Sequence, residues 1–505
     1  MSSKKITYSD IPLEVQKISQ DIKKAGFKAY LIGGCTRDIL ILRKPKDWDI
    51  TTDATPKEIM EIFGDRSFYE NKFGTVGIVQ PVSEKNIVDE SVKVVEVTTF
   101  RIDAQYSDQR RPDNVVFSKN ILEDIKRRDF TINAIAIEFN GEPENFTYEV
   151  IDPHGGLKDI KDKLLRTVGN PHERFGEDAL RILRGVRLLC ELDLKIDLET
   201  KKAMEFHVKN LANISRERIR DEFTRIVMSE KAYIGMHLCR EIGILAYISD
   251  DLNKSFGINQ NKAHKYDVFE HLLKCLEHSS KKNYPIEIRL AALFHDIGKP
   301  KSRRWSDKKG DWTFHGHEVV GERITREILE DLKFPGKIID EVCKLVRWHM
   351  FFSDTEQITL SAVRRMVANV GRESIWKLMD VRMCDRMGTG RPKENPYRLR
   401  KYKSMIEQVM TDPVSVSMLN INGLEIMNLG KIESGPKIGH ILHALLDEVI
   451  EEPKKNDKKF LVKRALELSK LSDSDLETIG LQAKEKKELE ESDKISQIRK
   501  KYFVE

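Results

Sequence analysis

Residues 31–38, LIGGCTRD, and residues 45–50, PKDWDI, decide the fold and the chemistry of this chain. Side chains alternate between the two faces of a β-strand, so Asp47 and Asp49 would share one face with Trp48 on the other. Two carboxylates that lie so close together can bind divalent metal ions. Gly33 and Gly34 end an apolar run and begin a helical one, where bare backbone N–H groups can hold a triphosphate. Together the two segments predict a site for nucleotidyl transfer.

Three further positions fit the same chemistry. Glu96, in the alternating run KVVEVTTF (residues 93–100), would supply a third carboxylate from a neighbouring strand, although an ordinary exposed strand residue would look the same. Arg37 and Asp38 follow the glycines at the start of the predicted helix. There Arg37 can reach a phosphate, and Asp38 can cap the helix or orient Arg37.

The segment RRDFTINAIA (residues 127–136) adds candidates for binding the nucleotide. Arg128 and Asp129 precede an apolar stretch that carries Asn133. Because an amide side chain both donates and accepts hydrogen bonds, Asn133 would suit a ribose hydroxyl. The alternative is a buried amide whose hydrogen bonds are satisfied within the protein.

A charged helix face is predicted in RFGEDALRILRGVRLLCEL (residues 174–192). At 3.6 residues per turn Glu177, Arg181 and Arg184 fall on one face with Asp178 beside them. Such a face is often only a set of solvated ion pairs. Cytosine and adenine, however, both present an amine donor beside a ring-nitrogen acceptor, which a carboxylate and an arginine complement. Asp178 and Arg181 would therefore accept CTP and ATP and reject UTP and GTP. The opposite, packing face comprises Ala179, Ile182, Leu183, Val186, Leu189 and Cys190.

The chain resembles bacterial class II tRNA nucleotidyltransferases and poly(A) polymerases, specifically the CCA-adding type. The resemblance lies in LIGGCTRD, PKDWDITTDATP, RRDFTINAIA, the segment from IDPHGG (151–156) to RGVR (184–187), and the distal LNINGLEIMNLG and SGPKIGHIL. Thr36 and Leu188 depart from it, where valine and an aromatic residue are usual. The resemblance implies two Mg²⁺ ions on Asp47 and Asp49 and ribose contact by Asn133. It also implies a protein template for base selection at Glu177, Asp178 and Arg181.

The segment FRIDAQYSDQRRPDNVVF (residues 100–117) separates members within this family. Relatives that add adenosine keep such a flexible loop, and those that add only the two cytidines lack or shorten it. Composition alone would describe a plain surface loop. The presence of Asp108, Arg110 and Arg111 favours addition of the final adenosine.

The middle of the chain carries a different set of polar residues. Histidine and aspartate recur in EHLLKCL (270–276), RLAALFHDIGKP (289–300), FHGHEVVG (314–321), VRWHM (346–350) and MDVRMCDRMG (379–388). Imidazoles and carboxylates are common ligands of divalent transition metals, although one histidine alone would more often be a packed core residue. The pattern resembles the HD phosphohydrolase domain that some members of this family carry. The resemblance implies a divalent transition metal of unknown identity, bound by His271, His295, Asp296 and Asp385, with His317 and His349 as second-site ligands or phosphate contacts.

Composition agrees with a multidomain enzyme. The 505 residues suffice for three or four domains, and 40% hydrophobic residues is ordinary for a soluble protein. Neither a membrane-spanning run nor a signal peptide is evident, so we expect a cytoplasmic protein without a membrane partner. The six cysteines are far apart, which indicates reduced thiols. A net charge of +5 does not by itself demand nucleic acid.

We expect an α+β fold: an N-terminal nucleotidyltransferase head with a mixed β-sheet, then an all-α neck, an HD-type body and a tail. The predicted boundaries are 1–140 for the head, 141–255 for the neck with the base template and RNA contacts, 256–400 for the metal-binding body, and 401–505 for a tRNA-binding tail with a charged C-terminus. Short β-branched runs support the head, and helical periodicity supports the remainder.

The predicted function is template-independent addition of CCA to the 3′ end of tRNA, from CTP and ATP, by two-metal nucleotidyl transfer. A second, phosphohydrolase activity would come from the HD-type body. Two alternatives stay open at this point: a poly(A) polymerase that uses ATP alone, and a metal-dependent phosphohydrolase whose head merely binds nucleotide or RNA. The sequence leaves the oligomeric state open.

Overall fold

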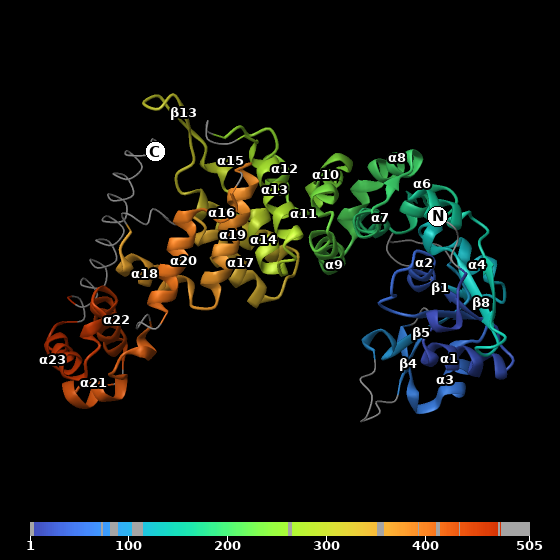
Figure 1. Cartoon of the computed structure of the whole chain (residues 1–505), viewed down its shortest axis with the longest axis horizontal. Helices are drawn as coiled ribbons and strands as arrows, with labels where there is room; N and C mark the ends of the chain where they lie inside the picture. The colour runs from blue at the N-terminus through green and yellow to red at the C-terminus, as the bar shows by residue number, and fades with distance from the viewer. Residues whose placement is uncertain are drawn as a thin grey trace. The chain divides into compact units, whose positions relative to one another are not determined.

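The structure is a computed structural model, and it forms two compact units (Figure 1). Unit 1 comprises Met1–Asn253 and Ile328–Phe334, and unit 2 comprises Lys254–Glu327 and Pro335–Glu505. Each unit is considered by itself. The described residues are 5–71, 74–80, 89–103, 115–260, 265–350, 358–391, 393–410, 415–433, 435–472 and 475.

Unit 1 is built on a seven-stranded sheet with the strand order β3-β4-β5-β2-β1-β8-β9. Strands β2 and β5 are parallel, whereas the other neighbours are antiparallel, so the sheet is mixed as the sequence predicted. The last strand, β9, extends the sheet beyond residue 140. The strands are β1 (Ala29–Ile32), β2 (Asp49–Thr52), β3 (Ser67–Asn71), β4 (Thr75–Val79), β5 (Val94–Thr99), β8 (Ala136–Asn140) and β9 (Thr147–Ile151).

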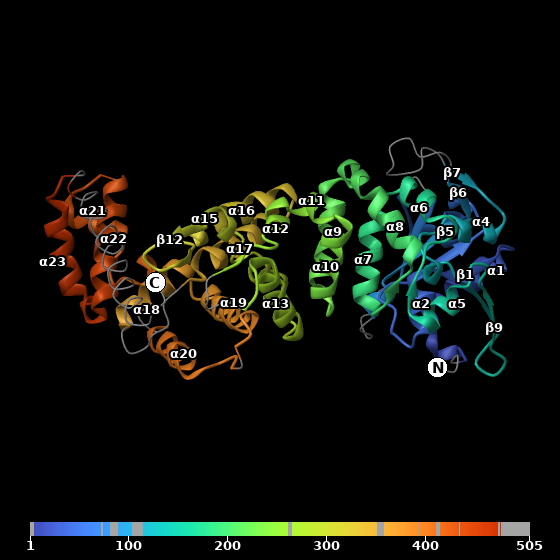
Figure 2. The same cartoon turned by 90° about the horizontal axis from the view of Figure 1, so that it is seen from above.

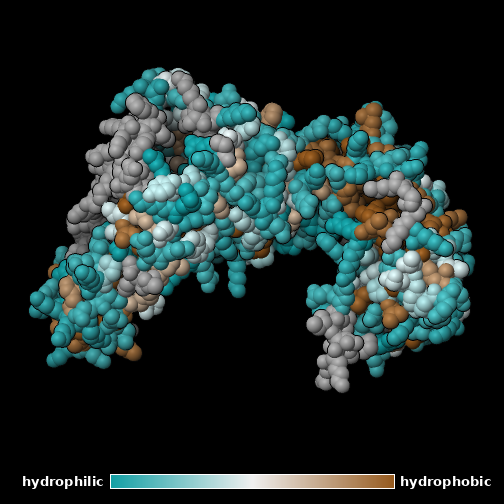
Figure 3. All heavy atoms as spheres, viewed as in Figure 1, coloured by the Kyte–Doolittle hydropathy of each residue, from teal (hydrophilic) through white to brown (hydrophobic). Residues whose placement is uncertain are grey.

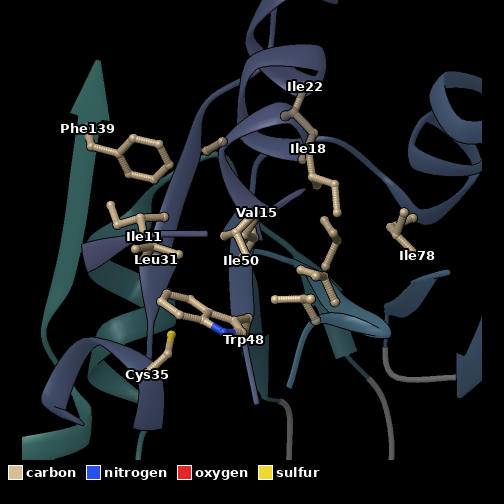
Figure 4. Packing of buried hydrophobic residues seen from close by; sticks show 14 of the residues in the cluster. Ile11, Val15, Ile18, Ile22, Leu31, Cys35, Trp48, Ile50, Ile78 and Phe139 are labelled. Atoms are coloured by element: carbon tan, nitrogen blue, oxygen red, sulfur yellow. The ribbon is translucent and has the colours of Figure 1, made fainter. Parts of the chain in front are cut away.

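In the core of the head, two helices pack against this sheet (Figure 4). Helix α1 (Leu13–Lys24) buries Val15, Ile18 and Ile22 at the helical spacing of three and four residues. Burial of each such side chain stabilises the fold by about 1.5–3 kcal/mol. Helix α3 (Pro56–Phe63) begins at a capping box, in which Thr55 and Glu58 satisfy each other's backbone N–H groups. Strand β2, which begins at Asp49 of PKDWDI, is the central strand of this sheet.

Short helices and two-stranded ribbons complete unit 1. Two pairs of short strands join it, β6 (Arg101–Asp103) with β7 (Val115–Phe117) and β10 (Leu164–Leu165) with β11 (Lys195–Ile196). After β9 the unit is almost wholly helical. The remaining helices are α2 (Gly34–Leu40), α4 (Ile121–Lys126), α5 (Gly156–Asp162), α6 (Pro171–Glu177), α7 (Leu180–Leu192), α8 (Leu198–His207), α9 (Arg216–Val227), α10 (Ala232–Ile242), α11 (Leu245–Ile248) and α12 (Asp250–Lys254).

Unit 2 is helical apart from one hairpin, β12 (Arg304–Ser306) with β13 (Asp311–Thr313), among the described residues (Figure 2). Helix α13 packs against α14 and α19, and these three helices with their ends carry His271, His295, Asp296 and Asp385. The α+β fold class with a helical C-terminal body is confirmed. The helices are α13 (Val268–Lys281), α14 (Ile286–Phe294), α15 (Lys299–Ser302), α16 (His317–Asp331), α17 (Gly336–Trp348), α18 (Leu360–Val370), α19 (Ser374–Gly388), α20 (Tyr397–Val409), α21 (Gly423–Gly430), α22 (Pro436–Glu451) and α23 (Lys458–Ser469).

Hydrophilic residues cover most of the face of unit 2 seen in Figure 3. Its apolar side chains lie inside, for example Leu272, Leu293 and Leu378, which are fully buried. In the described part of the chain, every helix is too short or too polar to span a lipid bilayer. The boundaries of the four domains that the sequence predicts remain a prediction.

Candidate functional site

The two early aspartates face the glycine turn that precedes α2. Trp48 is 2% exposed and lies in the core of the head, whereas Asp47 is exposed and Asp49 half-buried. A methyl group added to Gly33 would lie 3.1 Å from Asp49 Oδ2, and one added to Gly34 would lie 4.0 Å from Asp47 Oδ1. The two carboxylates therefore lie on the same side of the chain, away from Trp48.

Glu96 lies beside Asp49 on the parallel strand β5. The two residues are directly paired in the register of β2 and β5. Val95 and Val97 are fully buried, and Glu96 between them is exposed. Because directly paired residues of neighbouring strands project from the same face of a sheet, Glu96 adds a third carboxylate next to Asp49. Carboxylate oxygens are the ligands that Mg²⁺ prefers, so this donor set fits a divalent cation.

Gly33 is the position where the turn tolerates no side chain. Its φ of +82° is a conformation that favours glycine. Any Cβ here would also meet Arg128 Nη1 at 3.3 Å, in addition to Asp49. The bare backbone of Gly33 thus lies between a carboxylate and a guanidinium group. A phosphate chain that carries metal ions would find both kinds of partner at this turn.

Arg37 is engaged with other protein groups rather than open to a ligand. Its Nε and Nη2 donate to Asp38 Oδ1 at 2.9 and 2.7 Å, and its Nη1 donates to Asn133 Oδ1 at 2.7 Å. Burial raises the pKa of Asp38, although the charge of Arg37 opposes this rise. A direct bond from Arg37 to phosphate would require some of these bonds to be exchanged. The described contacts position Asn133 and fix the start of α2.

Asp129 continues this network toward α7. Asn133 Nδ2 donates to Asp129 Oδ1 at 3.4 Å, and Arg184 Nε and Nη2 both lie 2.8 Å from Asp129 Oδ2. Burial alone would raise the pKa of Asp129, but the charges of Arg184 and Arg181 hold it well below its usual range. The network joins the head to α7, the helix that carries Arg184.

The Asp129–Arg184 pair makes a testable contribution to stability. Because the pKa of Asp129 is lowered on folding, the pair stabilises the protein above the unfolded pKa near 3.8, and the contribution is lost as the pH falls below that value. We expect Asp129→Asn to lower the free energy of unfolding by about 1–2 kcal/mol at pH 7, because Asp129 is buried but the Arg184 side chain is 39% exposed. The difference from the wild type should shrink below about pH 4. The loss is complete only below the folded pKa, so urea midpoints at pH 7 and pH 2 measure this.

Asp193→Asn is the matched control, since the ion pairs of Asp193 with Lys163 and Lys231 lie at the surface. Surface pairs contribute little. Equal urea midpoints for Asp129→Asn and the wild type at pH 7 would contradict the stabilising role of the buried pair.

The predicted template helix is in fact two helices, which corrects the sequence-based expectation. Helix α6 ends at Glu177, α7 begins at Leu180, and Asp178 between them has an extended backbone. The Asp178 side chain accepts a hydrogen bond from the N–H of Leu180 at 3.0 Å. Its second oxygen accepts one from Arg218 Nη2 at 2.9 Å. The packing face was predicted correctly, because all six of its apolar residues are buried.

The charged groups at this break pair differently from the expectation. Arg181 Nη1 donates to Glu177 and to the carbonyl of Arg174, whereas Asp178 pairs with Arg218 of α9. Arg181 Nη2 also donates to the carbonyl of Arg127 at 3.2 Å. Sequence reasoning missed the long-range partner Arg218. The break thus carries three carboxylate–guanidinium pairs instead of one: Glu177 pairs with Arg174 and Arg181, and Asp178 pairs with Arg218.

Part of the predicted flexible loop can be placed. Strands β6 and β7 pair antiparallel, with Arg101 opposite Phe117, and they form the two ends of this segment. Asp108, Arg110 and Arg111 lie outside the described residues. Their role in adenosine addition stays a prediction.

In unit 2, four of the predicted ligands gather around one point. His271 Nε2 lies 3.1 Å from His295 Nε2 and 3.3 Å from both Asp296 Oδ2 and Asp385 Oδ1. His295 Nε2 lies 3.3 Å from Asp296 Oδ2 and 3.7 Å from Asp385 Oδ1. Helices α13 and α19 supply His271 and Asp385, and the end of α14 supplies the adjacent His295 and Asp296. Two imidazole nitrogens and two carboxylates are a donor set that fits a divalent transition metal.

A second group shares Asp296. Its Oδ1 lies 3.1 Å from His317 Nε2 and 3.5 Å from His349 Nε2, and these two nitrogens are 3.3 Å apart. Asp296 therefore turns one oxygen toward each group. A single carboxylate in this position can bridge two metal ions. We call the six residues the His/Asp cluster: His271, His295, Asp296, His317, His349 and Asp385.

Three imidazoles of the cluster are oriented by the same kind of hydrogen bond, from Nδ1 to a backbone carbonyl. The Nδ1 atoms of His295, His317 and His349 lie 3.0, 2.7 and 2.7 Å from the backbone carbonyls of Ala292, Phe314 and Val346. A carbonyl can only accept, so each ring carries a proton on Nδ1, and Nε2 points inward, where its lone pair is available when the ring is neutral. This tautomer is the one that a metal ligand requires.

Charge in the cluster is balanced by two residues that sequence reasoning missed. Lys299 Nζ donates to Asp296 Oδ2 at 2.6 Å, and Arg382 donates to Asp385. Both lie three residues from their partners, so the spacing was visible in HDIGK and in RMCD. Burial disfavours the charged form of the histidines. At His295 the negative charge of Asp296 outweighs the effect of burial and raises the pKa of His295 to about 10. At His349 burial prevails and lowers the pKa to about 4. Protons and metal ions compete for the same Nε2 atoms.

Three family models match the chain. They are the poly A polymerase head domain at residues 29–166, the probable RNA and SrmB-binding site of polymerase A at residues 193–255, and the HD domain at residues 268–386. The CCA-adding enzyme of Geobacillus stearothermophilus is 33% identical over 331 residues, which are 65% of this chain and 68% of that enzyme. The CCA-adding enzyme of Geobacillus thermodenitrificans is 29% identical over 458 residues, or 90% of this chain and 96% of the relative.

The comparison with solved structures gives the same family. The crystal structure of Bacillus stearothermophilus CCA-adding enzyme in complex with CTP matches with a TM-score of 0.66 at 26% identity, covering 90% of this chain and 98% of that one. Thermotoga maritima CCA-adding enzyme complexed with tRNA-CCA matches with a TM-score of 0.51 at 16% identity, covering 92% and 99%, which shows a common fold. The chain therefore belongs to the family of CCA-adding enzymes.

Proposed function

We propose that this enzyme adds CCA to the 3′ end of tRNA, using CTP and then ATP, in the cytoplasm. The observation that carries the proposal is the group of three carboxylates, Asp47, Asp49 and Glu96, around the bare turn at Gly33 and Gly34. Two of these carboxylates face the turn, and the third is paired with Asp49 in register. Membership of the CCA-adding family supports the choice of substrates.

Two Mg²⁺ ions on these carboxylates would raise the acidity of the tRNA 3′-hydroxyl and neutralise the charge that develops on the departing pyrophosphate. The chain's own residues orient the reactants. Asp47 and Asp49 would hold these ions beside the turn. Arg128, next to Gly33, offers a cation to the remaining phosphates. The amide of Asn133 already bonds to Arg37 and Asp129, and its second N–H and second lone pair are assigned to the ribose.

Base selection is assigned to the break between α6 and α7. Glu177 and Asp178 supply carboxylates there, and Arg181 and Arg218 supply guanidinium groups. A carboxylate accepts from the exocyclic amine of cytosine or adenine, and a guanidinium donates to the adjacent ring nitrogen. Uracil and guanine would place donors against donors and acceptors against acceptors.

The direct test uses tRNA that ends at the discriminator base. CTP alone should extend it by two residues, CTP with ATP by three, and ATP alone should not yield the CCA product. Gel sizing of the product separates the outcomes. A long tail made from ATP alone would identify a poly(A) polymerase instead, and no pyrophosphate release at all would contradict nucleotidyl transfer.

Arg181→Ala is expected to relax base choice. The variant loses the donor that contacts cytosine and adenine, so the preference for CTP over UTP should fall by about tenfold or more, as expected for loss of a specific hydrogen bond. Competition between CTP and UTP on the truncated tRNA measures this preference.

Arg225→Ala serves as the control for base choice, because Arg225 pairs with Glu191 at the surface of α9. An unchanged preference in Arg181→Ala would count against the template assignment and leave nucleotidyl transfer intact.

A second function is proposed for unit 2: hydrolysis of phosphate esters at the His/Asp cluster. The observation that favours it is the pair of ligand groups joined by Asp296, each with Nε2 atoms turned inward. Transition metal ions bound there would activate water and polarise a phosphoryl oxygen. Measurement of bound metal after purification, followed by assays on a model phosphodiester with added Mn²⁺, Co²⁺, Ni²⁺ or Zn²⁺, tests both parts. Absence of both metal and hydrolysis would contradict this function.

A further inference from the structure

The β12–β13 hairpin presents two tryptophans on one face. Trp305 and Trp312 are directly paired across the two antiparallel strands, so their side chains project from the same side. Their ring centroids are 5.2 Å apart in an edge-to-face arrangement, and Trp305 is 52% exposed. The hairpin forms a sheet of only two strands, and in Figure 1 the loop near β13 stands out from the neighbouring helices. When a ligand covers large aromatic side chains on such an exposed ribbon, the burial of their apolar surface favours binding.

Cations surround these rings. The guanidinium of Arg303 lies 3.6 Å from the centroid of the Trp312 ring, a stacked contact. Arg304 is exposed, and its Nη1 donates to the carbonyls of Lys301 and Arg303. Residues 299–311 contain six lysines and arginines against two aspartates. The hairpin thus combines stacking surfaces with positive charge.

The base of the hairpin is tied to the His/Asp cluster. The carbonyl of Phe314, which follows β13, lies 2.7 Å from His317 Nδ1. Lys299, which donates to Asp296, also lies over the Phe314 ring at 5.6 Å. The segments on both sides of the hairpin, at Lys299 and Phe314, therefore contact residues of the cluster.

We propose that the β12–β13 hairpin binds single-stranded RNA, with a base stacked on Trp305 and phosphates near Arg303 and Arg304. Aromatic rings beside cations are the general means by which proteins hold single strands without reading their sequence. A protein partner would also cover apolar rings, but the excess of positive charge favours a polyanion. The proposal concerns binding and is independent of whether the cluster hydrolyses its ligand.

The test measures the affinity of the full-length protein for a fluorescein-labelled oligouridine by anisotropy, in EDTA. Trp305→Ala should weaken binding by about tenfold, because stacking of one base on an aromatic side chain has an effect of this order. Trp305→Phe should restore most of the affinity, and Arg304→Gln should reduce the salt dependence of binding by about one released ion. Tyr397→Ala is the matched control, since Tyr397 is an equally exposed aromatic residue at the start of α20.

Because the head and neck also bind RNA under the proposed function, a second readout locates the contact. An oligouridine that contains 4-thiouridine is cross-linked by light, and the modified peptides are identified by mass spectrometry. Cross-links at Trp305 or Trp312 support the proposal. Cross-links in unit 1 alone, or equal affinities of Trp305→Ala and wild type, would overturn it. Circular dichroism of each variant shows that the fold is kept.

Discussion

Asp47→Ala is expected to abolish nucleotide incorporation while leaving the protein folded. Asp47 is exposed, and its carboxylate faces Gly34 rather than the core, so its loss should change the free energy of unfolding by only about 0.5 kcal/mol. One carboxylate fewer leaves the metal ions under-coordinated at the reacting phosphate. The rate of CMP incorporation into tRNA that lacks CCA should fall by about a thousandfold or more, since such ions contribute several kcal/mol to the transition state.

Asp65→Ala controls for the loss of an exposed acidic group in the same part of the chain. Its incorporation rate and thermal midpoint should equal those of the wild type. Normal turnover by Asp47→Ala would disprove the assignment of the metal site. A large fall in its thermal midpoint would instead show that Asp47 has a structural role.

Local patterns in the sequence predicted which of residues 47–49 is buried. Alternation with a period of two places Trp48 opposite the two aspartates, and Trp48 is buried whereas Asp47 is exposed and Asp49 half-buried. The strand is shorter than predicted, because β2 begins only at Asp49. The neighbour Glu96 required the further inference that two alternating runs would pair, and their parallel register places it next to Asp49. The ligands of the His/Asp cluster were predicted from the resemblance of their motifs to the HD phosphohydrolase domain, because the five short segments lie far apart in the sequence.

Contacts between distant segments could not be predicted in this way. The break at Asp178 is invisible to helical periodicity, since the apolar spacing continues across it. An aspartate can bond to nearby backbone N–H groups and so compete with the helix, but whether it does so depends on its partners. Here the partner is Arg218, which is 40 residues away in sequence. The contact of Arg37 with Asn133, 96 residues apart, is of the same kind. Such pairs are set by how the helices pack, and the single sequence does not record this.

The second large effect is expected from Asp296→Asn. One oxygen of Asp296 faces His271 and His295, and the other faces His317 and His349, so this residue alone belongs to both ligand groups. An amide binds divalent metal ions much more weakly than a carboxylate and cannot bridge two of them with negative charge. Any metal that the wild-type protein binds at the cluster should therefore be lost from the variant. Hydrolysis of a model phosphodiester should fall by about a thousandfold.

Two comparisons make the result specific to the cluster. Asp385→Asn removes a ligand of one group only, so it should lower metal content by about half. Asp380→Asn, on the same helix α19, removes a carboxylate that bonds to Tyr284 outside the cluster and should leave metal and hydrolysis unchanged. CCA addition should persist in all three variants, because the carboxylates of the head are untouched. If Asp296→Asn retained its metal and its hydrolytic rate, the bridging role of Asp296 would be refuted. If it also lost CCA addition, the two sites could not act as separate catalysts.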